Sequence, residues 1–334
     1  MKKQDTATKI SKQVSAKLQE IADAIADGSA TADDFQMPFG GTGGAPHNVD
    51  SQHYATGSNA LICWIMGITH YSTYDGWLRA GYAVPAGQQS IVSLRKPMPV
   101  KYERENKQTG ETEEHCFTKF SAFAIWDFSQ VVLRTPETDA ALQEKWDRRS
   151  KQSGRERKIV PPMPEKPWTP PVVERRTDVE LQTAVKDYIA NTGANVEWID
   201  ADRAFYTPST NKITLPLPER FRDTKHSTAA QNLASTALHE LGHWTGGAQQ
   251  LGRDFSMQRR QYAAEELLAE SVSAILCAQL GVESTMRIDH AQYIASWLQA
   301  LNNDPKFIFD TGSAAQKAVD YLNSLQPAAL TKAA

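Results

Sequence analysis

Near the start of the chain, hydrophobic residues recur at three- and four-residue steps from Ile10 to Ile25. This spacing places them on one face and predicts an opening amphipathic helix. Three later segments are rich in β-branched and aromatic residues: 89–94, 98–102 and 117–126. A polar stretch at 103–115 separates the last two, which is typical of strands joined by a loop. We therefore expect an α+β fold with an antiparallel sheet in this half of the chain.

The second half of the chain has mostly helical periodicity, over 228–244, 262–280 and 290–301. A short apolar run at 213–218 contains two prolines, and it predicts an edge strand because proline cannot donate to an inner ladder. Residues 59–67 are compatible with either a helix or a buried strand, since their length does not distinguish the two.

Composition changes between the two halves. Residues 148–158 are strongly basic, and six prolines lie between 161 and 171. Such a stretch favours an extended, semi-rigid connector. We therefore expect three regions: an N-terminal domain at 1–135, a basic and proline-rich linker or insertion at 136–178, and a C-terminal domain at 179–334.

Charge, cysteines and hydropathy restrict the class of protein. The formal net charge is −3, which argues against a strongly basic nucleic-acid-binding domain but allows a local basic patch. Three widely spaced cysteines exclude a disulfide framework and a CxxC zinc site, and we expect buried, reduced thiols as in a cytoplasmic protein. The longest apolar run, 60–69, is about half of a membrane span, and the N-terminus does not resemble a signal peptide.

The sharpest chemical signal is His239-Glu240-Leu241-Gly242-His243, an HExxH motif. On a helix, two histidines four residues apart share one face and can bind the same metal ion. Glu240 beside them can polarise a metal-bound water and take its proton. Imidazole and carboxylate ligands suit zinc, with three protein ligands and a water in a catalytic site. The predicted cofactor is zinc, with another divalent metal as the alternative.

Three glutamates on the next predicted helix are candidates for the third ligand: Glu265, Glu266 and Glu270. Glu266 and Glu270 lie one turn apart on one face, so one can bind metal while the other hydrogen-bonds a ligand histidine. Glu265 points about 100° away and is expected to be solvated. We favour Glu266 as the ligand and Glu270 as the hydrogen-bonding partner. The alternative is that all three are surface carboxylates, which the apolar Leu267 and Leu268 disfavour.

Segments around the motif together resemble the metallopeptidase-like domain of ArdC-type antirestriction proteins, also called TraC-like after plasmid primases with a similar N-terminal portion. The similar segments are 206–216, 235–246 and 262–270. The residues His-Trp-Thr-Gly at 243–246 make this resemblance more specific than HExxH alone. It implies a gluzincin-like fold, in which a small sheet packs on the motif helix and a glutamate from a following helix completes the site.

The N-terminal half is similar to the same family through residues 54–61, 71–81 and 123–130. In that family the N-terminal domain binds single-stranded DNA, and the resemblance implies the same here. The chain departs from the family's pattern in its longer loop at 103–115 and in the insertion at 136–178.

Candidate DNA contacts can be named from the residue types that bind single strands. Bases stack on aromatic rings, and basic groups neutralise phosphates. The candidate DNA contacts are Tyr74, Trp77, Arg79, Arg95, Lys96 and Lys119.

The leading hypothesis is an antirestriction-type protein of a mobile element or phage. It would act in the cytoplasm of a bacterial host, bind single-stranded DNA, carry a zinc metallopeptidase-like site and have no membrane partner. A host restriction or defence protein would be a further partner. One alternative is a non-enzymatic protein that protects single-stranded DNA and uses the metal structurally. The other is a dedicated metallopeptidase that acts on a host protein.

Overall fold

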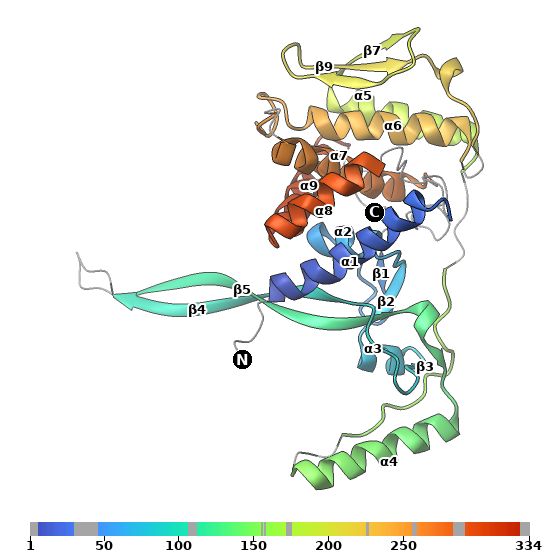
Figure 1. Cartoon of the computed structure of the whole chain (residues 1–334), viewed down its shortest axis with the longest axis vertical. Helices are drawn as coiled ribbons and strands as arrows, with labels where there is room; N and C mark the ends of the chain where they lie inside the picture. Colours follow the sequence, from blue (N-terminus) through green and yellow to red (C-terminus); the bar gives the residue numbers. More distant parts are fainter. Residues whose placement is uncertain are drawn as a thin grey trace. The chain divides into compact units, whose positions relative to one another are not determined.

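The computed structural model (Figure 1) has an α+β fold, as predicted. It describes residues 6–29, 46–105, 112–154, 156, 158–171, 176–224, 227–255, 259–282 and 291–327. Contacts divide the chain into two compact units. Unit 1 comprises Met1–Ile10 and Ser72–Pro167, and unit 2 comprises Ser11–Tyr71 and Trp168–Ala334. These bounds differ from the predicted regions, because residues 11–71 belong with the C-terminal part of the chain.

Unit 2 is mostly helical. Besides part of the opening helix, it contains the following described helices: α2 (Gly57–Ile65), α5 (Asp178–Thr192), α6 (Ala229–Trp244), α7 (Arg259–Leu280), α8 (Ala291–Asn303) and α9 (Phe307–Ser324). Helix α6 packs against α5 and α7, and α9 contacts α7 and α2. The helices predicted from periodicity at 228–244 and 262–280 are confirmed, as is the described part of 290–301. The predicted opening helix is α1 (Thr6–Ala26), which buries Ile10 and Val14.

The ambiguous segment at 59–67 is helical and forms most of α2. Gly312 of α9 allows a close approach, since a Cβ there would lie 2.5 Å from the Cα of Ser58. The Gln316 side chain then accepts a hydrogen bond from the backbone N–H of Gly57 at 2.9 Å. The close packing of α2 on α9 is therefore consistent with a helix at 59–67, which the length of the segment did not distinguish from a strand. Nearby, the short strands β1 (His47–Asn48) and β2 (His70–Ser72) pair in parallel.

A three-stranded sheet precedes the motif helix. Its strands are β7 (Asn195–Ile199), β8 (Phe205–Thr207) and β9 (Lys212–Pro216). The order is β7-β9-β8, with β9 parallel to β7 and antiparallel to β8. The prediction of an edge strand at 213–218 was therefore wrong. Pro216 is tolerated in the central strand because it occupies the last position, where no further ladder bond is needed. Strands β8 and β9 contact α6, which carries the motif.

Unit 1 contains a long antiparallel ribbon, formed by β4 (Val92–Glu105) and β5 (Thr112–Asp127) (Figure 1). The predicted antiparallel pairing is confirmed, and the expected strands at 89–94 and 98–102 merge into β4. Pro97 and Pro99 fit within this strand because a two-stranded ribbon leaves alternate N–H positions unpaired. Of the predicted loop at 103–115, residues 106–111 lie outside the described residues. The base of the ribbon is buried, as Val92 and Leu94 have no exposed surface.

The remaining elements of unit 1 are α3 (Tyr74–Arg79), β3 (Tyr82–Ala83), β6 (Val132–Leu133) and α4 (Pro136–Ser153). Helix α4 corrects the prediction of an extended connector over 136–178. Thr135 caps its first turn, Pro136 starts it, and Gly154 ends it in the left-handed conformation. Apart from Trp146 the helix buries little, so it has no strong hydrophobic period to predict it from. Residues 158–171 do lack regular secondary structure.

The three cysteines are free thiols. Cys63 and Cys277 are buried as expected, whereas Cys116 is exposed, because it lies on the part of the ribbon where both faces meet solvent. No helix in the described ranges is both long enough and apolar enough to cross a membrane.

Candidate metal centre

Two packed helices position the candidate ligands. Thr228 caps α6 by accepting a hydrogen bond from the backbone N–H of Gln231, so the helix begins ten residues before the motif and presents its histidines in regular geometry. Gly242 faces α7, where a Cβ would lie 3.1 Å from the Cα of Ala269. The absence of a side chain at Gly242 therefore lets α7 lie close to the motif and brings its glutamates within reach.

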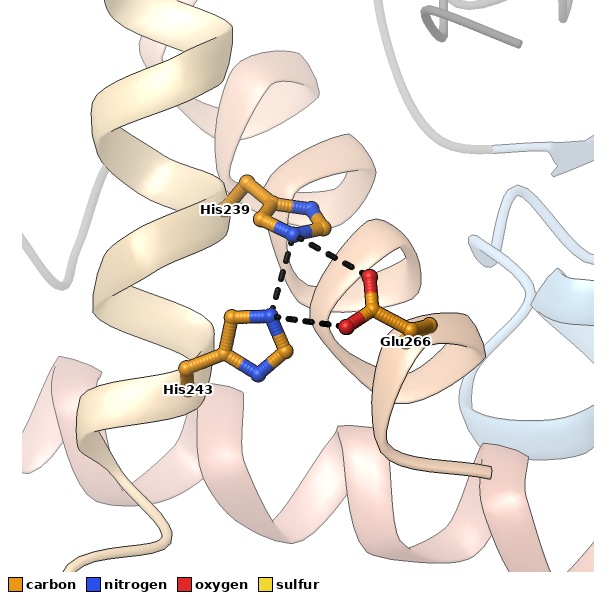
Figure 2. A group of neighbouring side chains, drawn as sticks. All are labelled: His239, His243 and Glu266. Carbon is orange, nitrogen blue, oxygen red and sulfur yellow. Dashed lines mark hydrogen bonds and ion pairs between the residues drawn. The ribbon is translucent and has the colours of Figure 1, made fainter. Parts of the chain in front are cut away.

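His239, His243 and Glu266 form a compact cluster (Figure 2). The two Nε2 atoms are 3.1 Å apart. The Glu266 carboxylate lies 3.8 Å from Nε2 of His239 and 3.7 Å from Nε2 of His243. Metal–ligand bonds of about 2.0–2.1 Å in a tetrahedron place ligand atoms roughly 3.3 Å apart. The observed separations bracket that value, so the cluster fits one small divalent cation.

Two further glutamates contact the outer nitrogens of the histidines. Glu270 lies 3.3 Å from Nδ1 of His239, and Glu265 lies 3.0 Å from Nδ1 of His243. A carboxylate accepts hydrogen bonds, so each Nδ1 carries the hydrogen and each neutral ring has its lone pair on Nε2. Two lone pairs then face each other across 3.1 Å. This arrangement is electrostatically unfavourable unless a proton or cation lies between them, which is the chemistry of a metal site.

Glu265 corrects the sequence interpretation, which expected it to be solvated. It is 8% exposed, and besides His243 it accepts two hydrogen bonds from Arg253, at 2.9 Å from Nε and 2.8 Å from Nη2. Burial would raise the pKa of Glu265, but the hydrogen bonds from His243 and Arg253 outweigh it and lower the pKa. Glu265 is therefore a buried, ionised carboxylate that orients a candidate ligand.

The residues that follow the motif hold Arg253 in place. Its Nη1 donates to the Thr245 hydroxyl at 2.7 Å, and its Nη2 donates to the Gly242 carbonyl at 2.8 Å. At Gly246 a Cβ would lie 2.9 Å from the Arg253 guanidinium carbon, so only glycine leaves room for it. Sequence reasoning missed Arg253, and the Thr-Gly pair after His243 was the one local signal of its position.

Glu240, the candidate general base, is 7% exposed. Burial raises its pKa, and the neighbouring histidines only partly oppose this. For His239, burial lowers the pKa, but the carboxylates of Glu270, Glu240 and Glu266 together outweigh burial and bring the pKa to about 9. A metal binding at Nε2 would have to displace that proton. The cluster thus combines a cation site with a carboxylate whose proton affinity is increased.

The predicted DNA contacts differ in accessibility. Trp77 has no exposed surface, and its Nε1 donates to the Trp126 carbonyl at 2.8 Å, so its ring cannot stack on a base in this conformation. The polar neighbours of Trp77 suggested exposure, but the short helix α3 directs it inward. Tyr74 is half-buried against Trp126. Among the basic candidates, the Arg95 guanidinium lies over the Phe120 ring. The exposed candidates are Arg79, Lys96 and Lys119.

Comparison with known proteins identifies the fold that carries this cluster. Residues 183–316 match a family model described as zincin-like metallopeptidase. The metal-free crystal structure of the antirestriction protein ArdC from the R388 plasmid superposes with a TM-score of 0.57 at 24% identity, covering 93% of this chain and 97% of that one. The chain has the ArdC fold. The resemblance to ArdC-type proteins seen in the sequence is thereby confirmed.

A Mn(II)-bound structure of the R388 ArdC gives a TM-score of 0.56 at 22% identity, with the same coverage of both chains. The DNA primase TraC of Escherichia coli is 39% identical over 165 residues, 49% of this chain and 14% of TraC. About half of this chain thus corresponds to a small part of that primase. The protein y4eC of Sinorhizobium fredii (strain NBRC 101917 / NGR234) is 27% identical over 314 residues, 90% of this chain and 89% of y4eC.

Proposed function

We propose that the chain is an antirestriction-type protein of a mobile element or phage, which acts in the bacterial cytoplasm, binds single-stranded DNA and hydrolyses a peptide bond at its metal centre. The observation that carries the catalytic part is the pair of Nε2 atoms 3.1 Å apart, with Glu266 completing a ligand set. The ArdC fold and the zincin-like match support the same reading. Zinc is the proposed metal, and the Mn(II)-bound relative supports a divalent ion generally.

Each side chain has a distinct role in this proposal. His239, His243 and Glu266 hold the metal, which when bound supplies Lewis-acid polarisation of the scissile carbonyl. Glu270 and Glu265 fix the two imidazoles through their Nδ1 atoms. Glu240 takes the proton of the attacking water and can return it to the leaving amine. Its increased proton affinity suits both transfers.

A metal titration tests the ligand assignment. We expect the wild-type chain to bind one divalent cation, and His239→Ala to lose that binding because two remaining ligands cannot hold the ion in competition with water. Isothermal titration with zinc and manganese, with metal content checked by mass spectrometry, measures this. His53→Ala removes an exposed histidine elsewhere and serves as the control. Full metal retention by a folded His239→Ala variant would contradict the assignment.

A host restriction or defence protein is the proposed peptide substrate. We expect wild-type protein, loaded with zinc, to cleave such a partner into defined fragments, and a chelator to prevent the cleavage. Incubation with purified restriction endonuclease subunits, followed by mass spectrometry of the products, measures this. If every subunit stays intact with the zinc-loaded protein, these host proteins are not its substrates.

A further inference from the structure

The β4–β5 ribbon has two chemically different faces. In an antiparallel pair, directly opposed residues point to the same face, and the register opposes Met98 with Lys119, Val100 with Phe117, and Tyr102 with His115. Lys96 lies on this face too, two residues before Met98. We call these residues the aromatic face: Lys96, Met98, Val100, Tyr102, His115, Phe117 and Lys119.

The aromatic face exposes large rings. Phe117 is 50% exposed and Tyr102 is 43% exposed. The Tyr102 ring stacks on His115, with centroids 5.5 Å apart and planes at 26°, and meets Phe117 edge-on at 5.8 Å. Met98 extends the apolar strip toward the base of the ribbon and is 42% exposed. Contiguous exposed apolar surface of this kind marks binding sites.

The charges of the aromatic face suit an anionic ligand. Lys96 and Lys119 are exposed, and neither has an ion-pair partner within the described ranges. On the opposite face the cations are already engaged. Arg95 lies 3.7 Å over the Phe120 ring, and Lys101 pairs with Glu114 at 2.7 Å. Among the described side chains of the ribbon, only those of the aromatic face therefore combine accessible rings with uncompensated ammonium groups.

We infer that the aromatic face of the ribbon is the surface on which single-stranded DNA binds, with bases stacked on Tyr102 and Phe117 and phosphates held by Lys96 and Lys119. The inference rests on the proposed single-stranded-DNA binding and gives it a location. Stacking on side chains requires bases whose faces are free, which a duplex does not offer. Of the six DNA contacts predicted from the sequence, two lie on this face, and the stacking rings were not among them.

Fluorescence anisotropy with labelled oligothymidylate tests this location in the full chain. Loss of each ring, in Tyr102→Ala or Phe117→Ala, is expected to weaken binding by about 5- to 160-fold, the range for one base–aromatic contact. Phe120→Ala removes an equally exposed ring from the opposite face and is expected to leave the affinity within about twofold. Thermal unfolding checks that all three variants are folded.

Salt dependence supplies a second readout that does not depend on removing rings. The affinity falls as salt rises, with a slope set by the number of phosphates neutralised. We expect Lys96→Gln with Lys119→Gln to reduce that slope by about 0.7 for each lysine, whereas Lys101→Gln leaves it unchanged. An unchanged slope in the Lys96 and Lys119 variant would count against the inferred phosphate contacts.

The possible failures are distinguishable. If the wild-type chain does not bind oligothymidylate even at low salt, the proposed DNA binding is wrong and the location falls with it. If the wild type binds but Tyr102→Ala and Phe117→Ala bind equally well, the proposed function stands and the inferred location is wrong. A loss in Phe120→Ala as large as in Phe117→Ala would also overturn the assignment to one face.

Discussion

Replacing Glu240 with glutamine is expected to lower peptide hydrolysis by about 10²- to 10⁴-fold, the usual contribution of a general base, while the protein keeps its metal. The amide has the same size but cannot take a proton from water. Glu240 is buried beside the candidate ligands and is not one of them, so its replacement leaves the metal cluster intact. Cleavage of a peptide library, read by mass spectrometry, and metal content measured on the same samples check both parts.

Glu219→Gln is the matched control, because this exposed glutamate lies on the same unit outside the cluster.

A DNA-protection assay against restriction, with wild type and Glu240→Gln, separates the metallopeptidase hypothesis from the non-enzymatic one. A metallopeptidase should lose protection in Glu240→Gln. Protection equal to wild type at equal metal content would instead favour the non-enzymatic protein that covers single-stranded DNA and uses its metal structurally.

Part of the candidate metal centre was predictable because it depends only on helix geometry. His239 and His243 share a face in any regular helix, and Glu266 and Glu270 are related by one turn. The structure brings His239, His243 and Glu266 together, and it places Glu270 against His239. The partner of Glu265 was not predictable in this way. Arg253 reaches Glu265 from the loop after α6, and this contact depends on the close packing of α7 at Gly242 and on the space left at Gly246.

The same division applies to the fold. Periodicity predicted α1, α6, α7 and the described part of α8, and strand-like composition predicted the antiparallel ribbon, since these are local patterns. It did not predict the helices α4, α5 and α9. It did not predict that β9 would be central, because strand order depends on which neighbours cover each edge. Nor did it predict the burial of Trp77 or the exposure of Tyr102 and Cys116. An exposed ring has the same sequence context as a buried one, so only the three-dimensional structure distinguishes them.

Arg253→Met is expected to lower the free energy of unfolding by about 3–5 kcal/mol, because it leaves the Glu265 carboxylate buried without its cation. The side chains of Arg253 and Glu265 are only 15% and 10% exposed, so solvent screens the pair little. Metal affinity should fall by about 10- to 100-fold as His243 loses its fixed orientation. Urea unfolding in chelator and metal titration measure the two effects. Arg220→Met breaks a more exposed ion pair, which solvent screens, and should leave the urea midpoint close to that of the wild type.

A double variant separates stability from metal binding. In Arg253→Met with Glu265→Leu, the buried charge is gone and apolar groups fill the space, so most of the lost stability should return. Metal affinity should stay low, because Glu265→Leu removes the acceptor for the Nδ1–H of His243. A purely structural ion pair would behave differently, since affinity would return together with stability. If Arg253→Met unfolds at the wild-type urea concentration and binds metal with wild-type affinity, neither role of the pair holds.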